Sequence, residues 1–155
     1  MSQFKFSVGP WNVHTGADSY GPETRKPIDL ETKFAKFAEL GFSAVQFHDD
    51  DAVPNINDYT EEEIKQKARE VKALLDKYNL KAEFVAPRLW MDPHTVDGGF
   101  MSTRKEDREY AMWRAYRSID IAKELGTDLI VLWLAREGTL CAESKSPVWA
   151  TKQLV

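Results

Sequence analysis

The stretch Phe42-Ser43-Ala44-Val45-Gln46-Phe47-His48-Asp49-Asp50-Asp51 decides the fold class of this chain. Its first six residues form a strand-like run, and a histidine with three carboxylates follows where a parallel strand would open into a loop. Active sites of α/β barrels lie at this end of the strands. Neighbouring carboxylates can orient an imidazole and raise its basicity, which makes His48 a candidate acid–base residue. The alternative is that the acids form a solvated loop and His48 is incidental.

Strand-like and helix-like segments alternate outward from this stretch. Helices are predicted where a cap precedes an amphipathic run or a glycine follows one. Asp29 is the expected cap of the first helix, and the pairs Thr60/Glu63 and Thr103/Glu106 are expected capping boxes of the next two. The predicted strands are 4–8, 42–47, 81–87 and 128–134, and the predicted helices are 30–40, 61–79, 103–125 and one that begins near 147.

Two of these segments have a distinctive apolar pattern. The helix after Thr103 should carry Met112, Tyr116, Ile119 and Ala122 on one side. The segment 128–134 is continuously apolar, which is typical of a strand that is buried on both faces.

Alternation of strands and helices predicts a parallel sheet with right-handed crossovers. A complete (β/α)8 barrel takes about 250 residues, so this chain would supply about the first four βα units. Residues 1–155 are then expected to be the N-terminal half of a single TIM-barrel domain. A small flavodoxin-like open sheet is the alternative. However, Gly98-Gly99 lacks the further glycines or the Lys-Ser/Thr of a phosphate-binding loop.

A short internal repeat links two residues that lie far apart in the sequence. Glu39-Leu40-Gly41 and Glu124-Leu125-Gly126 each end a predicted helix, and the seventh residue after each glycine is His48 in one unit and Trp133 in the other. Side chains at equivalent strand positions point in the same sense. If His48 points into a central cavity, Trp133 should line that cavity too.

Composition narrows the classes of partner. The net charge is −4, from 21 basic and 25 acidic residues, and no basic stripe indicates a nucleic-acid partner. No stretch is apolar for long enough to predict a membrane span. Cys141 is the single cysteine, which fits a reducing cytoplasm.

Several motifs resemble those of the xylose isomerase family, over essentially the whole chain. They are Phe47-His48-Asp49-Asp50-Asp51, Asp97-Gly98-Gly99-Phe100, Trp133 followed by Arg136-Glu137-Gly138, Trp11-Asn12-Val13, Tyr20-Gly21 and Thr24-Arg25. The resemblance implies a tetrameric (β/α)8 barrel that interconverts an aldose and a ketose with two divalent metal ions (Mg, Mn or Co). The first candidate reaction is the conversion of D-xylose to D-xylulose by a hydride shift.

The resemblance also implies roles for individual residues. His48 would help to open the cyclic sugar and Asp51 would hold the imidazole of His48. Trp133 and Trp90 would be walls of the sugar site, and Trp11 is assigned to the same site. Tyr20 matches an aromatic residue that enters from a neighbouring subunit. Apolar walls suit a hydride shift because they keep water away from the reacting carbons.

Departures from the family pattern leave the identity of the sugar substrate undetermined. Leu134-Ala135 replaces two glycines, Pro87-Arg88-Leu89-Trp90 is unlike the usual segment, and Asp92 stands in place of a histidine. The metal ligands and the catalytic lysine of the family would lie outside this chain. Asp49, Asp50 and Asp51 are adjacent and alternate in direction, so they are poorly placed to share one metal. Arg136 and Glu137 are interpreted either as an ion pair beneath the site or as an ordinary surface pair that adds little stability.

Two alternative functions remain open at this point. The protein could be another metal-dependent TIM-barrel sugar isomerase or epimerase. Alternatively, the chain could be a non-catalytic half-barrel that pairs with a partner through the sheet edge after the fourth strand.

Overall fold

A computed structural model describes residues 4–17, 20–134, 137 and 145–155. Its sheet has three parallel strands in the order β1 (Ser7–Val8), β2 (Ala44–His48) and β3 (Lys81–Ala86). A flavodoxin-like sheet would place the second strand at the edge, in the order 2-1-3. Since neighbouring strands here follow the order of the sequence, that alternative is wrong, and the fold is part of an α/β barrel.

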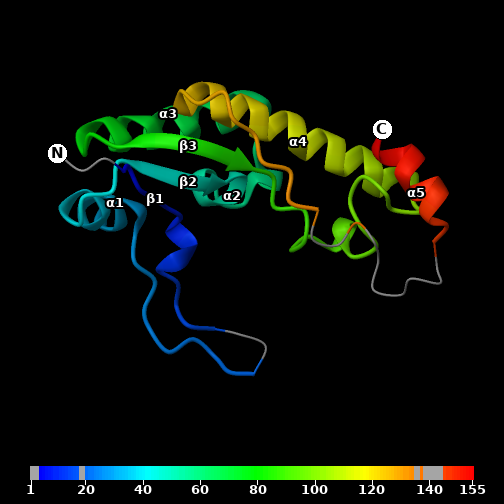
Figure 1. Ribbon diagram of the computed structural model, residues 1–155, viewed down its shortest axis with the longest axis horizontal. Coiled ribbons are helices and arrows are strands. Elements are labelled where there is room, and N and C mark those ends of the chain that lie inside the picture. Colours follow the sequence, from blue (N-terminus) through cyan, green and yellow to red (C-terminus); the bar gives the residue numbers. More distant parts are fainter. Residues whose placement is uncertain (1–3, 18–19, 135–136, 138–144) are drawn as a thin grey trace.

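The helices are α1 (Leu30–Glu39), α2 (Asp49–Ala52), α3 (Glu61–Lys77), α4 (Lys105–Leu125) and α5 (Pro147–Leu154), with short 3-10 turns η1 (Pro10–Asn12), η2 (Ile56–Asp58) and η3 (Pro93–Thr95). In Figure 1, α3 and α4 run along the sheet, and residues 13–17 and 20–29, between η1 and α1, project away from the body. None of the helices in the described part of the chain is long and apolar enough to cross a membrane.

The hydrophobic core lies between the sheet and the helices. Alternate residues of β2, Val45 and Phe47, are fully buried, as is Val85 of β3. They belong to one cluster with buried side chains of three helices, namely Phe34, Phe37, Ile64, Ala68, Leu75, Ile121 and Leu125. Strand periodicity therefore directs Gln46 and His48 to the opposite face of the sheet, which the helices do not cover.

The predicted helix ends are confirmed for the first two long helices. The Asp29 carboxylate accepts the Thr32 N–H at 2.8 Å, and Thr60 forms a capping box with Glu63. The box predicted at Thr103 and Glu106 is wrong. Helix α4 begins after Arg104, and the Thr103 N–H and hydroxyl both donate to Asp97, at 3.0 and 2.7 Å.

The side of α4 that carries the apolar residues named from the sequence is not its buried face. Met112, Tyr116 and Ile119 are 46%, 55% and 37% exposed, whereas Ala122 is buried. The buried stripe instead carries polar residues among apolar ones: Asp107, Ala111, Arg114, Arg117, Ser118, Ile121, Ala122 and Leu125. An apolar-periodicity argument misses this stripe because its arginines are buried through ion pairs with carboxylates of other elements.

The predicted fourth strand is reduced to a single parallel bridge between Val85 and Ile130. The Val85 N–H donates to Leu129 and the Val131 N–H donates to Val85, but the pairing goes no further. Leu129, Leu132 and Leu134 are 49%, 51% and 40% exposed, so the segment is not buried on both faces. In the part of the chain that the structure describes, no strand pairs with its outer edge.

Two smaller differences concern the ends of strands. The first strand covers only Ser7–Val8, and Phe4 and Phe6 are exposed. The acidic segment after β2 is the helical turn α2 rather than a loop. Carboxylates are favourable in a first helical turn, where they face the free N–H groups. Cys141 lies outside the described residues.

Candidate active site

A cavity of about 400 Å³ lies at the carboxyl ends of the strands, on the face that the helices leave open. Its lining is mostly aromatic and apolar: Trp11, Gln46, His48, Phe84, Ala86, Trp90, Val131 and Trp133. The inference that His48 and Trp133 share a cavity is confirmed. A cavity of similar size at the amino ends is lined by residues such as Lys5, Ser7 and Glu83, away from His48.

The imidazole of His48 is held from several sides. Its ring centre lies 4.3 Å from that of Trp11 and 5.2 Å from that of Trp90, the latter in an edge-on arrangement. Its Nδ1 atom lies 3.0 Å from Asp51 Oδ2 and 2.9 Å from Arg88 Nη2. The Nε2 atom has no hydrogen-bond partner within the described ranges, and His48 lines the cavity. One nitrogen is therefore engaged by protein groups, and the other is available to a ligand.

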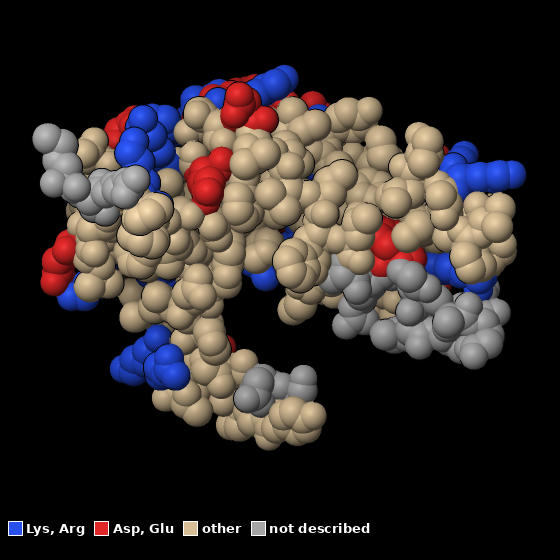
Figure 2. All heavy atoms as spheres, in the orientation of Figure 1, with Lys and Arg blue, Asp and Glu red and all other residues tan. Residues whose placement is uncertain are grey.

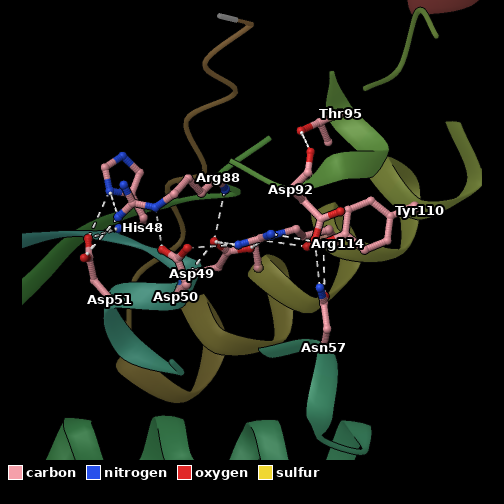
Figure 3. A network of polar contacts seen from close by, with 11 residues as sticks. His48, Asp49, Asp50, Asp51, Asn57, Arg88, Asp92, Thr95, Tyr110 and Arg114 are labelled. Carbon is pink, nitrogen blue, oxygen red and sulfur yellow. Dashed lines mark hydrogen bonds and ion pairs between the residues drawn. The ribbon is translucent and has the colours of Figure 1, made fainter. Parts of the chain in front are cut away.

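Behind His48, two arginines and three aspartates form a continuous polar network (Figure 3). Asp49 is fully buried, and its carboxylate accepts from Arg114 Nε at 2.6 Å and Nη2 at 3.0 Å. It also accepts the Arg88 backbone N–H at 3.0 Å and the Ser118 hydroxyl at 3.3 Å. Burial alone would lower the pKa of the Arg114 guanidinium, but the Asp49 carboxylate outweighs it and raises that pKa. The pair thus ties β2 and α2 to helix α4.

Arg88 connects the network to the cavity. Its Nε donates to Asp50 at 2.7 Å, and its Nη2 lies 3.1 Å from Asp51 Oδ1. Burial and the neighbouring Asp49 charge raise the pKa of Asp50, and the Arg88 guanidinium opposes that rise. Both arginines face these acids, so each of the three carboxylates already forms an ion pair with an arginine side chain.

This donor set does not fit a metal ion. Each of the three aspartates already accepts from Arg88 or Arg114, and a bound cation would have to displace a guanidinium. Among the described residues, no group of three or more His, Cys, Asp or Glu side chains is placed to hold a metal.

The sequence-predicted residues separate into two groups. His48, Trp11, Trp90 and Trp133 meet at one cavity, with Asp51 behind the imidazole. Tyr20 is 99% exposed and does not line this cavity.

Sequence reasoning missed Arg88 and Arg114. The position of Arg88 directly after a strand, in the segment unlike the family pattern, was an available signal. Arg114 offered none, since it lies 65 residues from Asp49 in the middle of a helix.

Glu137 joins two of the sequence motifs, and its ion pair with Arg136 stays a prediction. It is 3% exposed, and its carboxylate accepts the N–H groups of Phe100 at 2.8 Å and Met101 at 2.9 Å. A Cβ at Gly99 would lie only 3.0 Å from Glu137 Oε1, so glycine allows this close approach. Arg136 and Gly138 lie outside the described residues.

The sequence of this chain is similar to those of known proteins. The family model for the xylose isomerase-like TIM barrel matches residues 34–154. A xylose isomerase of Thermus caldophilus is 35% identical over 137 residues, which cover 88% of this chain and 35% of that protein. A xylose isomerase of Thermus thermophilus is 34% identical over the same shares of both chains. This chain therefore spans about a third of the length of these curated relatives. On the family match and these identities, the chain belongs to the xylose isomerase-like TIM barrel family.

Proposed function

We propose that this chain is part of an aldose–ketose isomerase, with D-xylose to D-xylulose as the first candidate reaction. One observation carries the proposal: an imidazole with a supporting carboxylate stands in a tryptophan-walled cavity at the carboxyl ends of parallel strands. The named relatives are xylose isomerases, which supports a sugar isomerase rather than another barrel chemistry.

His48 is proposed to assist opening of the cyclic sugar. Its Nε2 atom would meet the ring oxygen or the adjacent hydroxyl, while Asp51 Oδ2 lies 3.0 Å from Nδ1 on the opposite side of the ring. Trp11, Trp90 and Trp133 would stack on the C–H faces of the sugar and exclude water. Two divalent metal ions (Mg, Mn or Co), with ligands outside this chain, are proposed to polarise the sugar oxygens in the complete enzyme.

Completion of the site requires further polypeptide. Leu129, Leu132 and the α4 residues Met112, Tyr116 and Ile119 are exposed apolar side chains, which supports the proposal that the remaining half of the barrel packs here. Figure 2 shows that uncharged side chains make up most of the face in view. Tyr20, at 99% exposure, is proposed to reach a neighbouring subunit of a homotetramer.

The test is turnover by the longest form of the protein that carries these residues. With Mg²⁺ or Mn²⁺ present, it should convert at least one cyclic aldose to its ketose. His48→Asn should slow that reaction at least 100-fold, within the range of a general acid–base contribution. His94→Asn is the matched control, because His94 is 54% exposed and pairs with Asp92 away from the cavity. Absence of turnover on a panel of aldoses would contradict the proposal.

A sugar epimerase is the second candidate. The observation that favours it is the altered cavity wall, where Trp90 follows the unusual Pro87-Arg88-Leu89 segment. Product analysis separates the two, since an isomerase forms a ketose from an aldose and an epimerase keeps the carbonyl class. If the chain is instead a non-catalytic half-barrel, no sugar product should form.

A further inference from the structure

We infer that Arg88 fixes the tautomer of His48, so that the neutral imidazole carries its proton on Nε2 and presents a hydrogen-bond donor to the cavity. The contacts of Arg88, Asp51 and His48 carry the inference itself. Its meaning for sugar chemistry rests on the proposed function.

The first step is an account of the hydrogens on Arg88. A guanidinium donates through all of its N–H groups and accepts none. The Nε hydrogen goes to Asp50 Oδ1 at 2.7 Å. The Nη2 atom carries two hydrogens and has two partners, Asp51 Oδ1 at 3.1 Å and His48 Nδ1 at 2.9 Å. For the second contact to be a hydrogen bond, Nδ1 must offer a lone pair.

The second step is that Asp51 has donors other than the imidazole, although its Oδ2 atom also lies 3.0 Å from His48 Nδ1. Its Oδ2 atom accepts the backbone N–H of His48 at 3.0 Å. Its Oδ1 atom accepts from Arg88. Both oxygens therefore have donors when Nδ1 is unprotonated. Asp51 then serves to anchor the guanidinium beside the ring, as Asp50 does from the other side (Figure 3).

The third step concerns how firmly Arg88 is held. Its side chain is 19% exposed, and its own backbone N–H donates to the buried Asp49. The guanidinium also lies 5.8 Å from the centre of the Trp90 ring. Arg88 is thus fixed at both its backbone and its head group, and its N–H direction is determined by the fold.

The consequence is a change in what His48 offers a ligand. With the proton on Nε2, the neutral ring donates to an oxygen lone pair, such as the ring oxygen of a cyclic sugar. It does not accept from the neighbouring hydroxyl. In the proposed isomerase, Arg88 is therefore a positioning residue that selects the sugar atom contacted by His48.

Nitrogen NMR of the protein labelled with ¹⁵N-histidine tests the inference without any sugar. The chain has 3 histidines, and His48→Asn identifies the signals of His48. At a pH where the ring is neutral, Nε2 of the wild type should give the protonated-nitrogen shift and Nδ1 the unprotonated one. In Arg88→Met the two shifts should exchange, because Asp51 then becomes the partner that captures a proton on Nδ1. His14 and His94 should not change.

Asp51→Asn tests the alternative that Asp51, and not Arg88, sets the tautomer of His48. The asparagine oxygen can still accept from Arg88, so this variant should keep the wild-type tautomer. If Asp51 set the tautomer through an Nδ1 proton, the wild type would show protonated Nδ1 and Asp51→Asn would alter it, which would overturn the inference. An unchanged tautomer in a folded Arg88→Met protein would do the same. Since no turnover is measured, failure here is distinct from failure of the isomerase proposal.

Discussion

Arg114 in the middle of α4 and Asp49 at the start of α2 form a buried ion pair with two parallel contacts, Nε to Oδ2 at 2.6 Å and Nη2 to Oδ1 at 3.0 Å. Their side chains are 4% and 0% exposed. The pair fixes the position of the segment that follows His48, and Arg88 is joined to the same carboxylate through its backbone N–H. The geometry beside the cavity therefore depends on a helix that does not line it.

Replacing Arg114 with leucine should destabilise the protein strongly. The Asp49 carboxylate would remain buried without its counter-ion, which typically costs about 3–5 kcal/mol. Unfolding by urea, followed by circular dichroism, measures the loss. Arg69→Leu is the matched control, because Arg69 pairs with Glu62 and Glu124 at 41% exposure and its removal should be far milder. Equal losses of unfolding free energy in the two variants would show that the buried pair stabilises the protein no more than an exposed pair does.

Glu137→Gln should also destabilise the protein, by about 1–3 kcal/mol. The glutamine NH₂ group would face one of the two N–H donors at Phe100 and Met101, so that one donor loses its acceptor. Glu70→Gln is a suitable comparison, since Glu70 accepts only from the exposed Gln66 side chain. If the urea midpoint of unfolding were the same for Glu137→Gln and the wild type, the Glu137 carboxylate would not be stabilising the segment at Phe100 and Met101.

Asp97 should make stability depend on acid pH. Burial acts to raise its pKa, but hydrogen bonds from Thr103 and the Lys145 ammonium outweigh it and hold the pKa at about 2, below the ordinary value of 3.8. The ionised carboxylate is thus more stable in the folded state. Its contribution is present above pH 3.8 and disappears as the pH falls toward 2.

With allowance for solvent screening at this partly exposed side chain, the contribution is about 1 kcal/mol. Asp97→Asn should therefore flatten the fall in unfolding free energy between about pH 5 and pH 2. Asp128→Asn, at an exposed position, should leave the profile unchanged. A profile of Asp97→Asn that is parallel to the wild type would argue against the assigned contacts.

Thr60→Ala should cost about 1 kcal/mol, because it removes the cap of α3. Glu106→Ala tests the box that the structure rejects, since helix α4 has no side-chain cap of this kind. It should change the unfolding free energy by only a few tenths of a kcal/mol through the helix dipole. A cost of Glu106→Ala equal to that of Thr60→Ala would restore the rejected capping box.

The sequence by itself determined the alternation of strands and helices and the ends of α1 and α3. It also determined that His48 and Trp133 meet at one cavity. These features depend on caps, strand periodicity and the offset from helix-ending glycines, all of which act over a few residues. The fourth strand failed as a prediction because apolar character does not supply a pairing partner on the outer side.

Only the tertiary structure decided which charges surround His48. Arg88 lies 40 residues from His48, and Arg114 lies 65 residues from Asp49. Whether a polar side chain on a helix is buried depends on which carboxylate the fold brings opposite it, and burial is tolerated only when the charges are paired. No local pattern encodes that pairing, because it arises when α4 packs against the ends of β2 and β3.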